Sequence, residues 1–473
     1  MEISQELKEK IDEMITSEMV VQKTVGTSLG IIHKDKLIYT KSYGAKDLEN
    51  RIPPDKDTLF GVASVTKSFV SMAILKLQEE GKLSIQDPVN KYLPVKLGYE
   101  DDPILIKHLM THSSGIPDIS DWAINSNYEE MYGLEVELPK IPLISWSDVY
   151  THINGAQEYV ERPNIEFHYN NMCYGLLGEI IEKVSGIPFQ DYIKAQILTH
   201  VGMTRSGFKR NNILTDENLA KCYIKDASSK KNRAIAIEYP IEEIMDAAGG
   251  LFCSITELAR YAALHINKGF LDGTQLISKD IINEMQIQQF VESYPNTSFT
   301  AFYGDYGKTG YGYGFVVNED FFGTKLIQHS GSYSGASAWF AILPEKEIGV
   351  VMLSNKHPSP RMFAQAILIE LLGLSAKDNF HVLTLRNHFE KFTGTYQSYK
   401  NVDQIKVTNN GGQLYVKFNT DGSTIPIIPK TDEKEPFDFY IPTDTGGRMP
   451  FRFKVTEEKT WAYFERNKWK KIS

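Results

Sequence analysis

A serine and a lysine three residues apart, set at the start of an apolar helix, constrain this chain more than any other feature. Residues 60–70 read FGVASVTKSFV, and apolar side chains then recur at helical spacing as far as Leu77. Glu79-Glu80-Gly81 supplies a polar end and a glycine stop. Ser64 and Lys67 are therefore predicted to lie one turn apart on one face of a helix.

This pairing is typical of nucleophilic catalysis. A serine hydroxyl attacks poorly until a neighbour accepts its proton, and a lysine can do so only while its amine is neutral. The free N–H groups at a helix N-terminus can also stabilise an oxyanion. The alternative is an N-cap serine followed by a solvated lysine. The same spacing recurs at Ser206/Lys209 and Ser228/Lys231 without an apolar helix behind it.

Length and charge limit the classes of partner. A chain of 473 residues exceeds what one core normally holds, so we expect one large domain and a smaller one. Apolar residues make up 42% of the chain, and 51 Lys and Arg against 60 Asp and Glu give a net charge of −9. Since there is no long basic run, neither nucleic acid nor a membrane is expected as a partner.

The N-terminal sequence and the cysteines indicate a compartment. The first ten residues are charged where an export signal needs an apolar core, and no run of 18 apolar residues occurs. Cys173, Cys222 and Cys253 are odd in number and widely spaced, which favours reduced thiols over a disulfide framework or a metal site. We therefore expect a cytoplasmic protein.

The periodicity predicts an α+β fold followed by an all-β domain. A helix over residues 3–20 precedes a hairpin of strands 27–33 and 36–43, and strands over 326–335, 336–343 and 347–354 precede a helix over 361–372. Beyond residue 375, short alternating runs are divided by Asn-Gly, Asp-Gly and Gly-Gly turns, which predicts an antiparallel barrel or sandwich. The runs cover 392–396, 404–408, 413–418, 424–428, 437–441, 451–455 and 461–466. The predicted domains are 1–375 and 388–473.

The stretch 60–70 and the loop 81–94 resemble the Ser-x-x-Lys helix and following loop of the serine β-lactamase and penicillin-binding-protein superfamily. The branch they resemble most contains class C β-lactamases, D-aminopeptidases of the S12 peptidase type and family VIII esterases. Residues 104–117 resemble a helix and turn of the same branch. Within them, His108 and His112 are spaced as a metal pair could be, but a packing or hydrogen-bonding role is the other interpretation. Residues 121–160 are similar to a variable insertion that walls the cleft.

Two further motifs carry the resemblance. Tyr169-x-Asn171, before a helix, resembles the second motif, although the triplet also occurs at residues 294–296 and 399–401. Lys308-Thr309-Gly310 matches a third motif by its letters, but it precedes what looks like the strand before the catalytic one. The strand at 326–335, with His329-Ser330-Gly331-Ser332, is the better match. The resemblance implies that it is an edge strand facing the nucleophile.

The resemblance implies a serine hydrolase with an acyl-enzyme and with no metal or organic cofactor. Ser64 would attack, Lys67 and Tyr169 would carry the proton, and Asn171 would orient Lys67 and the substrate. For Tyr169 to act as a base, its pKa must lie well below the ordinary value of about 10. The N–H groups of Ser64 and of Ser332, which directly follows Gly331, would form the oxyanion hole. His329 would replace a lysine that binds a substrate carboxylate.

The sequence indicates the reaction class more narrowly than it indicates the substrate. A small peptide, amide or ester is expected, with a peptidase on small or D-residue-containing peptides favoured. A carboxylesterase or a β-lactamase on the same fold are alternatives, and so is a catalytically silent scaffold protein. The C-terminal domain, expected to be a lipocalin-like barrel, resembles domains that abut the cleft or mediate oligomers in relatives. A passive appendage is the other interpretation of this domain, and both a monomer and a homo-oligomer remain open at this point.

Overall fold

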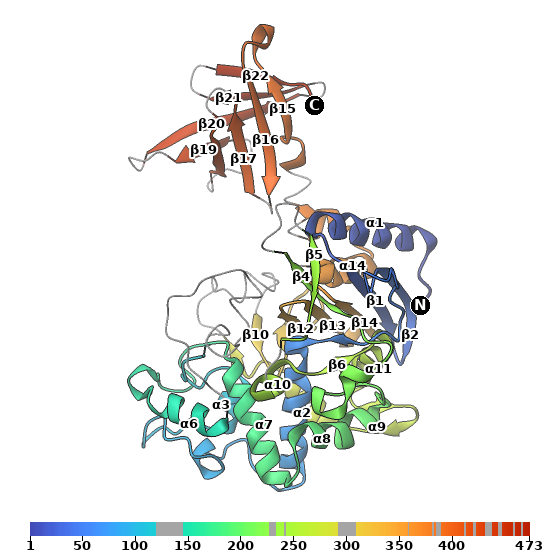
Figure 1. Cartoon of the computed structure of the whole chain (residues 1–473), viewed down its shortest axis with the longest axis vertical. Helices are drawn as coiled ribbons and strands as arrows, with labels where there is room; N and C mark the ends of the chain where they lie inside the picture. The colour runs from blue at the N-terminus through green and yellow to red at the C-terminus, as the bar shows by residue number, and fades with distance from the viewer. Residues whose placement is uncertain are drawn as a thin grey trace. The chain divides into compact units, whose positions relative to one another are not determined.

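The computed structural model divides into two compact units, Met1–Leu368 and Ile369–Ser473, which we call unit 1 and unit 2. Figure 1 shows the elements along the chain. The structure describes residues 1–119, 145–226, 233–240, 243–291, 309–357, 359–380, 383–384, 389–410, 413–419, 422–430, 438–442, 447–456, 459–464 and 467–473. Most of the predicted insertion at 121–160 lies outside these residues, as do Lys308, Ser228/Lys231 and the Tyr-x-Asn at 294–296.

Unit 1 is built on an antiparallel sheet of eight strands in the order β2-β1-β14-β13-β12-β11-β10-β9. The strands are β1 (Gly26–His33), β2 (Lys36–Gly44), β9 (Phe290–Val291), β10 (Thr309–Tyr311), β11 (Val316–Asn318), β12 (Leu326–Tyr333), β13 (Ala336–Leu343) and β14 (Ile348–Ser354). The predicted β1–β2 hairpin is confirmed, and β1 joins the run of sequential strands from β9 to β14 by pairing with β14. Buried side chains occupy all of β13 and β14, as expected of strands covered on both faces.

Helices cover both faces of this sheet (Figure 1). The helices of unit 1 are α1 (Gln5–Gln22), α2 (Thr66–Glu79), α3 (Ile106–Met110), α6 (Trp146–Asn154), α7 (Asn171–Ser185), α8 (Phe189–Ile193), α9 (Thr199–Val201), α10 (Asp246–Gly249), α11 (Ile255–Ile266) and α12 (Lys279–Met285), with α14 (Phe363–Leu371) crossing the boundary into unit 2. Helices α1 and α14 lie on one side of the sheet, and α11 packs on the other against β1, β2, β13 and β14. The predicted α+β class is confirmed.

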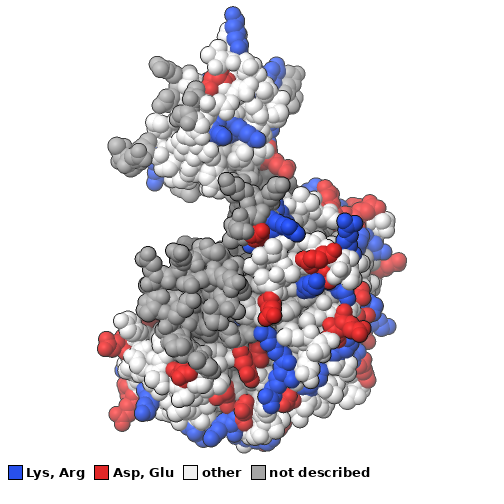
Figure 2. All heavy atoms as spheres, viewed as in Figure 1, with Lys and Arg blue, Asp and Glu red and all other residues white. Residues whose placement is uncertain are grey.

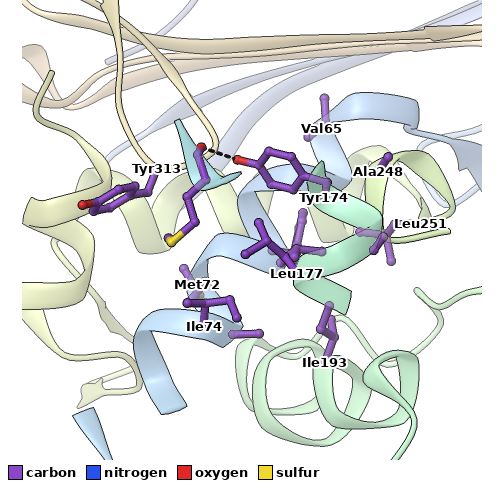
Figure 3. Close-up of a cluster of buried hydrophobic side chains, with 14 of the residues drawn as sticks. Val65, Met72, Ile74, Tyr174, Leu177, Ile193, Ala248, Leu251 and Tyr313 are labelled. Atoms are coloured by element: carbon purple, nitrogen blue, oxygen red, sulfur yellow. Dashed lines mark hydrogen bonds between the residues drawn. The ribbon is translucent and has the colours of Figure 1, made fainter. Parts of the chain in front are cut away.

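Helix α2 is the centre of the helical part of unit 1. It packs against α7, α10 and α12, and every side chain from Thr66 to Leu75 is buried. A helix that is buried on all sides can hold a polar group away from water. Figure 3 shows Met72 and Ile74 of α2 among Tyr174 and Leu177 of α7, where the Tyr174 hydroxyl donates to the Met110 carbonyl at 2.8 Å.

Three short strand pairs also occur among the described residues of unit 1. They are β3 (Phe60–Gly61) with β6 (Phe252–Cys253), β4 (Cys222–Lys225) with β5 (Ala234–Ile237), and β7 (Phe270–Leu271) with β8 (Thr274–Gln275). The β3–β6 pair brings the residues before α2 beside those after α10. It therefore fixes the start of the nucleophile segment against the turn that follows α10.

Unit 2 contains a closed barrel of eight antiparallel strands after the short helix α15 (Ala376–Asn379). The strands are β15 (Gly394–Gln397), β16 (Gln404–Asn410), β17 (Gln413–Phe418), β18 (Thr424–Pro429), β19 (Asp438–Pro442), β20 (Arg448–Val455), β21 (Thr460–Phe464) and β22 (Asn467–Lys471). The predicted small antiparallel barrel is confirmed. Its interior is filled by side chains, among them Phe392, Tyr396, Phe453 and Trp469, as the diameter of an eight-stranded barrel allows.

The surface shows no dominance of one charge in the view of Figure 2, where acidic and basic side chains are interspersed over unit 1. Among the described residues, the helices are too short or too polar for any of them to cross a bilayer.

Candidate active site

Ser64 lies in a tight turn directly before α2. The turn η1 (Ala63–Val65) is a 3-10 helix, and Ala63 has φ of +47°, in the left-handed region that costs a residue with a side chain about 1–3 kcal/mol. The turn is held by Val62 N–H, which donates to the Leu251 carbonyl at 2.9 Å. This arrangement lifts Ser64 out of the buried helix, and its side chain remains half-buried at the edge of the site.

Lys67 is fully buried and its amine faces three acceptors. Its Nζ lies 3.0 Å from Ser64 Oγ, 2.8 Å from Asn171 Oδ1 and 2.8 Å from the Ala248 carbonyl. A neutral amine has two hydrogens and one lone pair. If the hydrogens go to Asn171 and Ala248, the lone pair is directed at the Ser64 hydroxyl, which is the geometry a general base needs.

Asn171 and Tyr169 are presented by the start of α7. Asn170 caps this helix, since its Oδ1 accepts from Cys173 N–H at 2.9 Å, and its Nδ2 donates to the Ile116 carbonyl at 2.8 Å. Tyr169 precedes the cap, and its ring centroid lies 4.9 Å from Lys67 Nζ. Its side chain is 37% exposed, so Tyr169 lies between the buried lysine and solvent.

A chain of buried hydrogen bonds runs behind Tyr169. His112 Nδ1 accepts from Asn170 N–H at 3.0 Å, so its Nε2 carries the hydrogen and donates to Tyr311 Oη at 3.3 Å. Tyr311 in turn donates to His329 Nε2 at 2.9 Å, and His329 Nδ1 donates to the Ser330 carbonyl at 2.6 Å. The donor and the acceptor are therefore fixed at every hydrogen bond from Asn170 to Ser330.

Both histidines in this chain are neutral. Burial, and then the proximity of the Lys67 amine, lowers the pKa of His329 to about 3. Burial lowers the pKa of His112 well below its usual value, with Lys67 and His329 as further causes. The ring of His112 packs against the ring of Tyr169, with centroids 4.2 Å apart. The position of Tyr169 is therefore supported by a neutral imidazole. His329 therefore presents no charge to a substrate carboxylate at neutral pH.

Strand β12 meets the nucleophile turn at Gly331. A Cβ at this position would lie 2.0 Å from the Val62 carbonyl and 3.0 Å from Ser64 N, so only glycine permits this approach. The expectation that β12 is an edge strand is wrong for its first part, because β11 pairs with Leu326–Gln328. Since β11 reaches no further than Gln328, the β11-facing side from His329 to Tyr333 is left without a paired strand in the part of the sheet that the structure describes.

The three sequence motifs thus meet around Ser64, although Tyr169 lies 105 positions after Ser64 and His329 lies a further 160 positions on. The other Ser-x-x-Lys in the described residues does not form such a pair, because Ser206 Oγ donates to Glu257 and Lys209 Nζ donates to the Tyr239 carbonyl at 2.9 Å. Tyr399 and Asn401 lie in a 3-10 turn of unit 2. Among the described residues, the copies at Ser206/Lys209 and Tyr399/Asn401 therefore do not form a second site of this kind.

Sequence reasoning missed His112, Tyr311 and the Ala248 carbonyl. His112 had been singled out only as one half of an i, i+4 pair, whereas His108 Nδ1 accepts from Leu105 N–H at 3.1 Å in the same helix. Tyr311 directly follows the rejected Thr309-Gly310, and β10 indeed lies one strand beyond β11. No sequence signal marks a backbone carbonyl such as that of Ala248.

One exposed group among the described residues has the composition of a metal site. Glu161, Glu166 and His168 place their ligand atoms within 4.8 Å of one another. His168 Nε2 lies 3.1 Å from Glu161 Oε2 and 3.4 Å from Glu166 Oε2, so the three already form ion pairs when His168 is protonated. These contacts account for the group without an ion.

Comparison with known families agrees with this geometry. Residues 11–374 match the beta-lactamase family model, and residues 376–470 match the Pab87 octamerisation domain. The chain is 27% identical over 359 residues to Protein flp of Staphylococcus aureus, covering 75% of this chain but only 64% of that protein. It is 25% identical over 345 residues to Penicillin-binding protein 4* of Bacillus subtilis, covering 70% of this chain and 68% of that protein.

Solved structures extend the similarity to the full chain. The octameric penicillin-binding protein homologue from Pyrococcus abyssi superposes with a TM-score of 0.83 at 32% identity, over 98% of this chain and 99% of that one. A penicillin-binding protein from Bacillus halodurans shares the fold of 76% of this chain, with a TM-score of 0.59 at 24% identity and 99% of its own length covered. The resemblance to β-lactamases and penicillin-binding proteins is confirmed, and this chain belongs to the beta-lactamase family.

Proposed function

We propose that the protein is a serine hydrolase that cleaves amide or ester bonds through an acyl-enzyme on Ser64. The observation that carries this proposal is the fully buried Lys67 amine, 3.0 Å from Ser64 Oγ and held by Asn171 and Ala248. If Asn171 and the Ala248 carbonyl accept the two hydrogens of the neutral amine, its lone pair can accept the proton of Ser64. Family membership supports the same reaction class.

The roles follow from the contacts. Ser64 attacks the carbonyl while Lys67 accepts its proton. Tyr169 at the solvent side gives its proton to the leaving group, and Lys67 returns a proton to Tyr169. Because Asn171 Oδ1 accepts from Lys67, its Nδ2 is the group that donates to a substrate carbonyl. The N–H groups of Ser64 and Ser332 stabilise the oxyanion, and water then releases the acid. The scheme uses protein groups for every proton transfer.

The substrate we favour is a small peptide, including those with D-residues, or a neutral amide or ester. His329 supports this choice, because a neutral imidazole with both nitrogens engaged offers no cation for a carboxylate beside the scissile bond. Because His329 supplies no positive charge for a substrate carboxylate, an aminopeptidase or an esterase fits this site better than a carboxypeptidase. A panel of D- and L-aminoacyl amides, esters and nitrocefin would rank these substrates.

The reaction class is tested by labelling with a fluorophosphonate and by intact-mass spectrometry after penicillin treatment. The wild-type protein should gain one adduct, and Ser64→Ala and Lys67→Ala should gain none. Ser206→Ala is the matched control, because Ser206 repeats the Ser-x-x-Lys spacing in the chain but contacts Glu257 instead. Equal absence of label in the wild type and in Lys67→Ala would instead support a catalytically silent scaffold.

We also propose that unit 2 assembles copies of this chain into a homo-oligomer. The match to the Pab87 octamerisation domain and the similarity to an octameric homologue support this. Tyr399 and Val402, between β15 and β16, are each 84% exposed and offer apolar area for such a contact. Native mass spectrometry of the full chain should show an assembly, and the double variant Tyr399→Ser, Val402→Ser should shift it towards smaller species if this surface takes part.

A further inference from the structure

Arg361 is a buried cation beside the strand that faces Ser64. It lies in the turn η9 (Pro360–Met362), between β14 and α14, and is 6% exposed. Its Nη1 donates a short hydrogen bond to the Gly331 carbonyl. Burying a guanidinium is costly, so its placement against one particular carbonyl of β12 calls for a role.

The turn that carries Arg361 is fixed to the neighbouring strand. Ser359 caps η9 and accepts from Arg361 N–H at 3.4 Å. Its Oγ lies 2.6 Å from Ser337 Oγ, and Ser337 also donates to the Lys356 carbonyl at 3.1 Å. Ser337 pairs with Ser332 across β13 and β12. Arg361 is therefore anchored opposite the strand position that contributes the second oxyanion donor.

The contact acts on one peptide unit. The Gly331 carbonyl and the Ser332 N–H belong to the same planar trans peptide, and they point in opposite directions. Arg361 holds the carbonyl end, while Gly331 itself lies close to Ser64 N. A hydrogen bond from a cation to the carbonyl draws electron density from the peptide nitrogen, which makes its N–H a stronger donor.

We propose that Arg361 is a positioning residue of the oxyanion hole, which orients and polarises the Gly331–Ser332 peptide so that the Ser332 N–H binds the developing oxyanion. The inference rests on the proposed acyl-enzyme chemistry. The positive charge of Arg361 also lies one peptide away from the site of negative charge, in a buried setting where such charges interact strongly. Arg361 thus stabilises the transition state through the Gly331–Ser332 peptide and does not contact the substrate.

Three variants at residue 361 separate charge, hydrogen bond and packing. Arg361→Met keeps an apolar stem, Arg361→Gln keeps a neutral donor, and Arg361→Lys keeps the charge. The matched control is Arg260→Met, because Arg260 also donates to a backbone carbonyl, that of Val201, at 2.6 Å. Folding of each variant is checked by thermal melting, and Arg361→Gln carries the test if Arg361→Met does not fold.

The readouts are kcat and KM on an activated ester, the inhibition constant of a boronic acid, and the infrared carbonyl stretch of the acyl-enzyme. We expect Arg361→Met and Arg361→Gln to lower kcat by about tenfold, less than the 10²–10³ for losing an oxyanion donor outright, with KM little changed. Boronate affinity should fall by the same factor, and the acyl carbonyl band should move to higher wavenumber. Arg361→Lys should recover part of each loss.

Two results would overturn the inference. One is a folded Arg361→Met or Arg361→Gln protein with wild-type kcat, boronate affinity and carbonyl band. The other is a loss of activity equal to the fraction of the variant protein that thermal melting shows to be unfolded, since that reports misfolding alone. If the wild-type protein itself forms no acyl-enzyme, the proposed function fails and the inference fails with it. Acylation of the wild type with unaffected variants at residue 361 rejects the inference only.

Discussion

Gly331 on β12 and Val62 before the nucleophile turn approach so closely that a Cβ on Gly331 would lie 2.0 Å from the Val62 carbonyl. We predict that Gly331→Ala displaces the turn and lowers kcat by about 10²-fold or more, because misplacement of a reacting group by about 1 Å can cost that much. The crowding should also cost about 1–3 kcal/mol in the free energy of unfolding. Steady-state kinetics and urea denaturation measure the two effects.

The control for this variant is Gly249→Ala. Gly249 lies on the other side of the same turn, but a Cβ there would come no closer than 3.6 Å to Ala63. Its activity should stay near that of the wild type. Equal kcat values for Gly331→Ala and Gly249→Ala would show that the close contact at Gly331 does not determine the position of Ser64.

The oxyanion donor on β12 is proposed to be a backbone group, and the side chain of Ser332 is exposed. Ser332→Ala should therefore keep kcat within about a factor of two, whereas Ser332→Pro, which removes the N–H, should lose about 10²–10³-fold. Burst kinetics with an activated ester would separate acylation from deacylation. A large loss in Ser332→Ala would contradict a backbone role.

Tyr311 links two buried histidines through their Nε2 atoms, and its loss would remove both of these hydrogen bonds. We expect Tyr311→Phe to lower the free energy of unfolding by about 1–3 kcal/mol, because buried polar groups lose their hydrogen bond. The ring of His112 should become less well ordered under Tyr169, so kcat should fall as well. Tyr313→Phe is the matched control, a neighbouring buried tyrosine outside this chain of hydrogen bonds, and it should change both quantities less.

Stability should depend on pH through His329. Its pKa is about 3 in the folded protein against a usual value of 6.5, so between these values the unfolded chain binds a proton that the folded chain does not. The free energy of unfolding therefore falls as pH drops below 6.5, and this residue contributes about 2 kcal/mol of loss between pH 7 and pH 5. Above pH 6.5 its contribution is constant.

A variant isolates this contribution from others. Burial raises the pKa of Asp246 and of Glu179 to about 7, which favours the folded state at low pH and opposes the histidine effect. His329→Asn cannot titrate but can still accept from Tyr311, so its stability should fall less between pH 7 and pH 5 than that of the wild type. Parallel curves for the two proteins would show that His329 is protonated when folded.

The sequence predicted the elements whose pattern is local. The β1–β2 hairpin, the helix that follows Tyr169-x-Asn171, and the Ser64/Lys67 pair all follow from residues within one short window. The last barrel strand, β22, was missed because Asn467–Lys471 is mostly charged and only Trp469 is buried. One inward side chain in five residues is a weak strand signal.

The remaining parts of the site depend on the tertiary fold. His112, Tyr311 and Arg361 come from three elements about 200 and 50 residues apart, and each residue type is common in a core. Nothing local marks the hydrogen-bond chain or the cation behind Gly331. The neutral state of His329 also follows only from its burial, which the residue letters around it do not reveal.

The closure of β15 to β22 into a barrel has a consequence for how copies of the chain could join. In a closed barrel the backbone groups of the first and last strands are already paired with each other, so a neighbour cannot add its own strand there. Attachment through the barrel therefore has to be made by side chains on its outer wall or by its connecting loops. Substitutions on that wall could then change the number of associated copies while the barrel itself stays folded.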